Sequence, residues 1–393
     1  MKHRFVGVMS ERIDGIDGLR AIAMTMVVAQ HCSLLPFGWT GVWLFYAISG
    51  FVISRQFLSG SYDAPTIAGT YKIFMLRRFW RIVPVYALYV LINVSLALAE
   101  GKTAILRELP FLLTFTYNWQ MIFEFVQPSE AGAFGHLWTV SVEEQFYLFF
   151  PLLMLALPGR RFLIVAGLLI IGGPLIRGIY SAAMIGADGD AGWKAFSIYA
   201  ASITQFDAFL TGAVLARCTP YFREHPRAAW YLLAGAVVVA ASYALVYSGI
   251  NRANGAQGVE ALRNIFSGIL YGEGREIFVY SVINLASASV LIATVLRKQF
   301  TAPLSWSPLS FVGRISYGAY LYHALILALL VRFVFGDNSG NPLPERILFF
   351  TTAWSITVFF AYVSFKYFEK PIMDWSKRKS SRYDISVAIE KPA

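Results

Sequence analysis

The stretch IDGLRAIAMTMVVAQH, from Ile16 to His31, has the apolar composition of a membrane-grade helix but contains one arginine and one histidine. Eleven positions separate Arg20 from His31, and at about 100° per residue they complete about three helical turns. Both side chains are therefore expected on one helix face, about 16 Å apart along the axis. Such residues are costly inside a bilayer, so they are functional candidates expected to face a protein interior or a wet cavity.

The composition of the whole chain is that of a membrane protein. Of its 393 residues, 57% are hydrophobic and only 14% are charged, and the mean hydropathy is +0.57. Soluble domains carry about 25% charged residues. The first apolar run is not expected to be a cleavable signal peptide, because it contains charged residues and no small-residue cleavage pattern follows it. The sequence therefore predicts an all-α polytopic membrane protein.

Ten apolar runs are long enough to cross a bilayer, which requires about 20 helical residues. They are expected near residues 16–35, 39–58, 79–98, 137–157, 162–181, 197–216, 229–248, 277–296, 315–335 and 347–367. An eleventh apolar stretch, Leu109 to Trp119, is too short and is predicted to be re-entrant or interfacial. The fold class expected is thus a bundle of about ten transmembrane helices.

Basic residues are unevenly distributed between the predicted loops. With ten spans, most lysines and arginines fall on one side, which by the positive-inside rule places both termini in the cytoplasm. The formal net charge of +10 is explained by this bias, so no nucleic-acid partner is expected. Residues 1–375 are expected to form the membrane domain, and residues 376–393 a short basic cytoplasmic tail that contacts membrane lipids. No feature of the sequence indicates an oligomeric state.

Two small residues, Ser49 and Gly50, interrupt the bulky apolar run GVWLFYAISGFVIS, which extends from Gly41 to Ser54. Small residues let helices approach closely, and packing is the favoured explanation for this segment alone. A buried glycine also lets a ligand approach the backbone, so both residues are candidates for ligand binding.

Three arginines, Arg77, Arg78 and Arg81, occur in LRRFWRIVP, at the predicted cytoplasmic entry of the third span. Arg78 and Arg81 are three positions apart and Arg77 and Arg81 four, so at least two guanidinium groups can converge on one anion. Guanidinium groups bind phosphate oxygens in a bidentate way, which suits a nucleotide-bearing donor from the cytosol. The alternative is ordinary positive-inside charge.

Two adjacent carboxylates occur within HLWTVSVEEQFYLFFP, from His136 to Pro151. Glu143 and Glu144 point about 100° apart on a helix, so one can face a cavity while the other finds a neighbouring helix. Glu143 is expected about 9 Å below the start of its span, at a depth where it approaches His31. A carboxylate bonded to an imidazole raises its basicity, as a general base requires. The alternative is a structural ion pair with an intramembrane arginine.

These stretches, together with GRISYGAYLYHALIL and the closing FEKP, resemble the bacterial membrane acyltransferase 3 family. The resemblance extends from about Ile16 to Pro371, and the ordered set of motifs makes it specific. Members of that family O-acylate surface polysaccharides, lipopolysaccharide and some small molecules. The resemblance implies an acyl-CoA donor, with acetyl-CoA expected, and a location in the bacterial inner membrane.

The resemblance also assigns roles to individual residues. The family's essential arginine and histidine match Arg20 and His31, and its intramembrane glutamate matches Glu143 better than Glu144. Its arginine cluster matches Arg77, Arg78 and Arg81. Two positions depart mildly from the family pattern, because Thr139 replaces a usual serine and Tyr322 replaces a common tryptophan. Some relatives add a C-terminal esterase-like domain, which this chain is expected to lack.

Other polar residues have less specific interpretations. Asp207 is either a cavity acid or the partner of a buried basic group, and His323 is expected to be a hydrogen-bonded core histidine. Tyr317 and Tyr320 are expected to be packing or interfacial residues. Neither a disulfide nor a catalytic role is expected for the two cysteines, Cys32 and Cys218. No metal-ligand motif is present in the sequence, so no metal is expected.

Two functions from different classes follow. The favoured one is an enzyme that moves an acyl group from acyl-CoA to a hydroxyl of a cell-surface or exported glycan. The alternative is a proton-coupled transporter in which His31, Glu143 and Asp207 relay protons. The arginine cluster favours the enzyme, since a phosphate-bearing donor needs such a dock and a proton relay does not.

Overall fold

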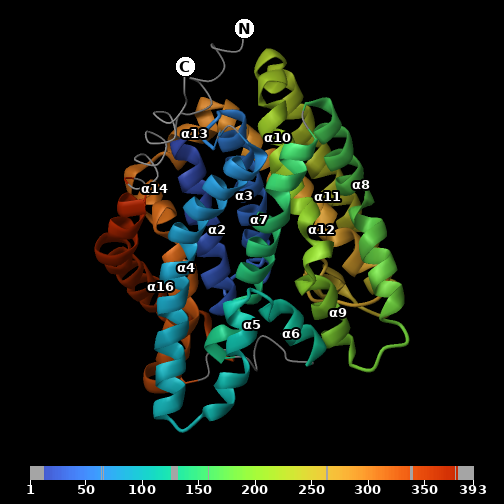
Figure 1. Cartoon of the computed structure of the whole chain (residues 1–393). Coiled ribbons are helices and arrows are strands. Elements are labelled where there is room, and N and C mark those ends of the chain that lie inside the picture. Colours follow the sequence, from blue (N-terminus) through green and yellow to red (C-terminus); the bar gives the residue numbers. More distant parts are fainter. Residues whose placement is uncertain are drawn as a thin grey trace.

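The computed structural model describes residues 13–62, 64, 66–124, 132–157, 159–262, 264–336, 340–376 and 378. Every regular element within these residues is a helix, and they contain no strand (Figure 1). The predicted all-α class is therefore confirmed. The basic tail predicted over residues 376–393 lies almost entirely outside the described residues.

The helices follow one another along the chain, and two of them end in a π-helical turn, η5 and η6. The order is α2 (Asp14–His31), α3 (Thr40–Leu58), α4 (Ile67–Ala99), η1 (Thr103–Arg107), α5 (Leu109–Leu113), α6 (Tyr117–Phe123), η2 (Gly132–Phe134), α7 (Trp138–Ala156), α8 (Arg160–Ala183), α9 (Ala191–Ala200), η3 (Ser202–Thr204), α10 (Phe206–Glu224), α11 (Pro226–Ala253), η4 (Gly258–Leu262), α12 (Arg275–Leu296), α13 (Lys298–Leu304), α14 (Ser307–Arg314), α15 (Ser316–Leu330), η5 (Val331–Phe335), α16 (Leu343–Ser364) and η6 (Phe365–Glu369).

Seven helices among the described residues are long and apolar enough to cross a membrane. They are α3, α4, α8, α11, α12, α15 with its π-helical turn, and α16 with the residues that extend it to Ser376. The helices α2, α7 and α10 occupy the remaining predicted positions and carry more polar residues. The chain is thus a multi-pass membrane protein, and the count of ten spans and the cytoplasmic termini stay predictions.

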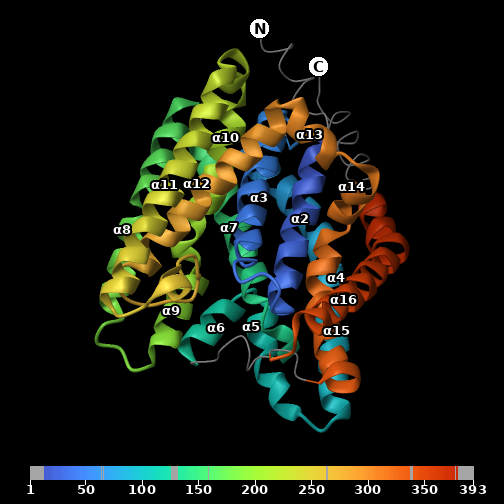
Figure 2. The same ribbon diagram turned by 180° about the vertical axis from the view of Figure 1, so that it is seen from behind.

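Inner and outer helices differ in what they expose. α2 and α3 lie in the middle of the bundle, with α8 and α11 on one flank and α4 and α16 on the other (Figures 1 and 2). Within an apolar stretch of 18 residues in each helix, 67% of the residues are buried in α3 but only 17% in α11. α8 exposes an aliphatic stripe at helical spacing, made of Ile164, Leu168, Ile171, Leu175 and Ile179. Such a stripe suits contact with lipid chains.

Two close helix crossings hold the central helices in place. A Cβ atom on Gly50 of α3 would lie 1.9 Å from the Phe209 carbonyl oxygen of α10, and one on Gly212 would lie 1.8 Å from that of Ala47. In the second crossing, a Cβ atom on Gly313 would lie 1.8 Å from the carbonyl oxygen of Asp17. Glycines let these backbones touch. They therefore set the positions of α2 and α3, which carry the candidate site.

The span predicted over residues 197–216 is not one continuous helix, because the chain breaks there into α9, η3 and α10. Polar side chains hold the break: the Thr204 hydroxyl donates to the Ile198 carbonyl at 2.6 Å, and the Gln205 amide donates to the same carbonyl at 3.0 Å. These bonds satisfy carbonyls that a continuous helix would have used. The three polar residues of ASITQ, Ser202, Thr204 and Gln205, were a sequence signal for this interruption.

The stretch from Leu109 to Trp119 is confirmed to be too short to span. It forms α5 and the start of α6, which have 5 and 7 residues. The Gln145 amide of α7 donates to the Phe115 carbonyl at 2.7 Å, and the Asn118 amide donates to the Ala200 carbonyl at 3.0 Å. The first bond holds the backbone of this stretch to α7, and the second holds its Asn118 side chain to the end of α9. The two cysteines are both free, as expected.

Candidate active site

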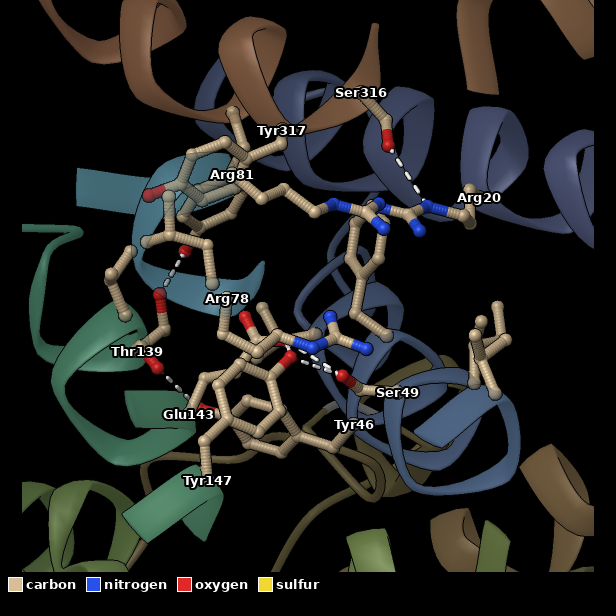
Figure 3. Close-up of a pocket in the computed structure, with 17 residues that line it drawn as sticks. Arg20, Tyr46, Ser49, Arg78, Arg81, Thr139, Glu143, Tyr147, Ser316 and Tyr317 are labelled. Atoms are coloured by element: carbon tan, nitrogen blue, oxygen red, sulfur yellow. Dashed lines mark hydrogen bonds between the residues drawn. The ribbon is translucent and has the colours of Figure 1, made fainter. Parts of the chain in front are cut away.

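A cavity lies between α2, α3, α4, α7 and α15, near the middle of the bundle (Figure 3). Its volume of about 70 Å³ has room for several water molecules. Both polar and aromatic side chains line it, and they come from five different helices. The sequence-predicted residues that reach it are Arg20, Ser49, Arg78, Arg81 and Glu143.

Three guanidinium groups face this cavity. The Nε atom of Arg20 donates to the Ser316 hydroxyl at 3.2 Å, and Arg78 lies over the Tyr147 ring, 5.0 Å from its centroid. Arg81 makes no hydrogen bond or ion pair with another described residue. The cavity lining contains one carboxylate, that of Glu143. The site therefore has excess positive charge, which suits an anionic ligand.

Arg77 does not join the other arginines of its cluster. Its Nη1 atom donates to the Ser61 carbonyl at 2.7 Å, and its guanidinium lies 5.5 Å from the centroid of the Tyr62 ring. Neighbouring helix positions point about 100° apart, so Arg77 faces the loop after α3 while Arg78 faces the cavity. Of the three predicted arginines, Arg78 and Arg81 thus converge on the cavity.

The Glu143 carboxylate is held by hydroxyl groups. The Ser49 hydroxyl donates to Oε1 at 2.8 Å, and the Tyr147 hydroxyl donates to the same oxygen. This arrangement binds the carboxylate without using any of the three guanidinium groups. Glu144 is not in the cavity lining, and its Oε1 atom has no hydrogen-bond partner among the described residues. Of the two glutamates, Glu143 is therefore the one at the cavity.

Gly50 lies against Phe209 of α10 rather than in the cavity lining. Its role is helix packing, and the predicted ligand contact is wrong for this residue. Ser49, one position earlier, points about 100° away from Gly50 and lines the cavity.

His31 lies at the end of α2, outside the cavity lining. The predicted contact with Glu143 is not formed, because that carboxylate bonds to Ser49 and Tyr147, about one and a half helical turns into α7. The neighbours of His31 are other imidazoles: its ring centroid lies 5.4 Å from that of His323, which lies 4.9 Å from that of His136. We refer to His31, His136 and His323 as the histidine cluster.

Tyr317 and Tyr320 line the cavity, which corrects their prediction as packing or interfacial residues. The Tyr320 hydroxyl is 2.7 Å from the Thr139 hydroxyl, and the Tyr320 ring centroid is 5.2 Å from that of His323. Tyr320 therefore contacts both the cavity and the histidine cluster. The expectation that His323 is a buried, hydrogen-bonded histidine is confirmed, since it bonds to the Tyr320 carbonyl.

Asp207 is the partner of a buried cation. Its Oδ2 atom accepts from Nη1 of Arg177 at 2.8 Å, and both side chains are buried. Of the two interpretations left open for Asp207, the ion pair is therefore correct. This pair involves α8 and α10, and Asp207 is absent from the cavity lining. The structure does not bring together the three residues of the proton relay that the transporter alternative requires.

Several site residues were missed by the sequence analysis. Tyr147 had a usable signal, because it follows Glu143 by four positions and such residues share a helix face. His136 also had one, since it begins the same motif. Tyr46 and Ser316 lie in apolar or small-residue surroundings, and nothing in their local sequence marked them.

The profile of one protein family, described as an acyltransferase domain, matches residues 13–366. The chain belongs to the acyltransferase 3 family. One relative, a protein of Staphylococcus aureus (strain COL) named provisionally as an O-acetyltransferase, is 27% identical over 378 residues, covering 91% of this chain and 57% of the relative. The peptidoglycan O-acetyltransferase OatA of Listeria monocytogenes is 28% identical over 386 residues, covering 92% of this chain and 56% of the relative.

A third relative, from Bacillus subtilis and named provisionally as a peptidoglycan O-acetyltransferase, is 26% identical over 401 residues, covering 94% of this chain and 56% of the relative. The chain thus spans little more than half the length of these relatives. No solved structure matches it.

Proposed function

We propose that this acyltransferase moves an acetyl group from cytosolic acetyl-CoA to a hydroxyl of a cell-surface or exported glycan, in the bacterial inner membrane. The observation that carries the proposal is the convergence of Arg20, Arg78 and Arg81 on one cavity that contains a single carboxylate. CoA carries several phosphate groups, and guanidinium groups are the side chains best suited to bind them.

The donor would bind with its nucleotide outside the bundle. A cavity of about 70 Å³ holds a few waters but no nucleotide. The pantetheine arm is long and narrow, and about 16 Å separates Arg20 from His31 along α2. Arg78 and Arg81 would hold the phosphates while the arm extends toward the histidine cluster. The Thr139–Tyr320 pair lies between the two, so the arm would have to pass it.

His31 would act as the general base. It takes the proton from the acceptor hydroxyl, whose oxygen attacks the thioester carbonyl. The carbon–sulfur bond then breaks, and the proton passes from His31 to the departing CoA thiolate. An ester and CoA result, and no proton is gained or lost overall. Glu143 would tune the charge of the cavity, since it is bonded to Ser49 and Tyr147 and not to His31.

A glycan acceptor is supported by the names of two relatives, which describe peptidoglycan O-acetyltransferases. Polysaccharide and lipopolysaccharide sugars offer the same hydroxyl chemistry. The acceptor class proposed is therefore a sugar hydroxyl of such a glycan.

The test is acetyl-CoA consumption by purified protein in nanodiscs, followed by assay of His31→Ala and His31→Gln at matched protein amounts. Loss of a general base commonly costs about 10² to 10⁴ in rate. The matched control is His225→Gln, because His225 is exposed and its ring bonds to the Tyr221 carbonyl at the end of α10, outside the histidine cluster. Near-normal turnover in both His31 variants would refute the assignment of the base, and no consumption by the unaltered protein would refute the function.

A further inference from the structure

The histidine cluster contains more nitrogen atoms than the proposed chemistry uses. His31 alone serves as the base, whereas His136 and His323 lie beside it with no role in the transfer. Both are buried, with 7% and 0% of their surface exposed. Buried polar atoms nearly always have a hydrogen-bond partner in the protein, in water or in a ligand.

His323 has a defined tautomer. Its Nδ1 atom bonds to the Tyr320 carbonyl oxygen, and because a carbonyl can only accept, Nδ1 carries the proton. The Nε2 atom on the other side of the ring therefore presents a lone pair. That atom is buried and has no partner among the described residues. His323 thus offers one unused acceptor directed away from its own helix.

His136 supplies the complementary group. Neither of its ring nitrogens has a hydrogen-bond partner, although the carbonyls of Ala133 and Leu321 lie near the ring without hydrogen-bond geometry. A neutral imidazole has one N–H donor and one lone pair. His136 and His323, 4.9 Å apart between ring centroids, can therefore present a donor and an acceptor to the same small group.

One member of the cluster reaches the surface: His31 is exposed where α2 ends, and its ring lies 5.4 Å from that of His323 between centroids. A group that contacts His31 is therefore close to His323. The ring contacts of His136 and His323 are with each other, with His31 and with tyrosines. No group of histidine, cysteine or acidic residues in the described part of the chain is spaced to hold a metal ion. An uncharged group that both donates and accepts fits these conditions best.

We propose that His136 and His323 bind a second hydroxyl group of the acceptor sugar, next to the hydroxyl that His31 deprotonates. This inference rests on the proposed function. One hydroxyl has a single proton, so it cannot donate to His31 and to Nε2 of His323 at once. The bound hydroxyl is therefore a neighbour of the reacting one. The site selects a polyol such as a sugar over acceptors with one hydroxyl.

The experiment compares acceptors that differ in the second hydroxyl. Purified full-length protein in nanodiscs is given labelled acetyl-CoA with water alone, with methanol, or with chitopentaose, a soluble oligomer of N-acetylglucosamine. The unaltered protein should transfer acetyl to chitopentaose more efficiently than to methanol. Equal or lower efficiency with chitopentaose would overturn the proposed site. Failure to consume acetyl-CoA under any condition would instead overturn the proposed function.

Two variants of one residue separate binding from packing. His323→Gln places an amide oxygen near the position of Nε2, whereas His323→Asn keeps only the donor to the Tyr320 carbonyl. Losing the bond at Nε2 should raise the KM for chitopentaose about tenfold in His323→Asn and much less in His323→Gln. The acetyl-CoA dissociation constant should change less than about twofold in both, because the donor phosphates are proposed to bind at the arginines and not at His323.

The reverse order would overturn the inference, since a purely structural role through Tyr320 predicts that His323→Gln is the damaged variant. Equal KM values in both variants and the unaltered protein would overturn it as well. His225→Asn is the matched control, because that histidine also bonds to a backbone carbonyl but lies outside the cluster. His136→Phe keeps the ring shape without nitrogens and should raise the same KM.

Discussion

A fully buried arginine and two half-buried arginines at the cavity have opposite surroundings in this protein. Arg177 in α8 has every partner it needs, and its hydrogen bonds go to the Asp207 carboxylate at 2.8 Å, the Ser281 hydroxyl at 2.6 Å, and the carbonyls of Thr204 at 2.8 Å and Ile277 at 2.9 Å. Arg20 at the cavity has one hydrogen bond, to Ser316 at 3.2 Å, and Arg81 has none to a described residue.

The difference indicates which arginines hold the fold and which await a ligand. An unpaired charge in a low-dielectric interior is costly, so a cation with complete partners fits a structural role. Cations that line a cavity and lack partners retain binding capacity for an anion. Both kinds of arginine lie within the helical bundle, and they differ in their partners and in their burial.

The largest expected effect is on the structural arginine. Arg177→Ala leaves the Asp207 carboxylate buried without its cation and should destabilise the protein by about 3–5 kcal/mol. Thermal unfolding of the detergent-solubilised protein measures this. The double variant Arg177→Ala with Asp207→Ala should be less unstable than the single one, because it leaves no unpaired charge. Unchanged unfolding of Arg177→Ala would show that the ion pair contributes nothing.

The cavity arginines should show a smaller effect, on binding instead of stability. A charge-assisted contact contributes about 1.5–3 kcal/mol, so Arg78→Ala and Arg81→Ala should each weaken acetyl-CoA binding about tenfold or more. Their unfolding temperatures should stay close to that of the unaltered protein. Calorimetric titration in nanodiscs measures the affinity. Unchanged affinity would mean that the donor binds elsewhere.

Glu143 and Glu144 are adjacent in the sequence, but only Glu143 lines the cavity, so their variants can be compared directly. Glu143→Gln weakens the bonds from Ser49 and Tyr147 and removes the cavity's carboxylate, so kcat/KM should fall about tenfold. Glu144→Gln should change it by less than about twofold, since this residue is outside the cavity lining. Initial rates with acetyl-CoA at matched protein amounts test this. The opposite order would show that the carboxylate at the cavity is not the functional one.

The smallest effect is expected for Arg77, which is next to Arg78 in the sequence but does not face the cavity. Arg77→Ala removes a bond to the Ser61 carbonyl and should alter acetyl-CoA affinity by less than about twofold. It is also the matched control for Arg78→Ala, since both variants remove one arginine from the same turn. An equal loss of affinity in the two variants would show that they act only as a general positive charge.

Local properties of the sequence were sufficient for much of the fold. Runs of apolar residues located α3, α8, α11 and α12, because burial in lipid or protein requires about 20 such residues in succession. The same measure failed over residues 197–216, where Thr204 and Gln205 interrupt the helix by bonding to nearby carbonyls. Hydropathy averages over such residues and does not register individual hydrogen bonds.

The sequence predicted most of the residues at the candidate site but not which of them contact one another. Helical spacing placed Arg78 and Arg81 together, since their separation depends on a single helix. The partner of Glu143 depended on how α3, α4 and α7 pack, and depth along a helix alone wrongly favoured His31. Asp207 likewise had two open interpretations until α8 brought Arg177 to it.

Composition, periodicity and motif order thus indicated a helical membrane protein that resembles the acyltransferase 3 family, with Arg20 and His31 on one face of its first helix. Packing alone decided that the cations meet at a cavity with Glu143, Ser49 and Tyr147, while three imidazoles gather at the end of α2. A helix fixes the direction of its side chains over a few residues, whereas partners distant in the chain meet only through the packing of different helices, as at the glycine contacts of α3 with α10.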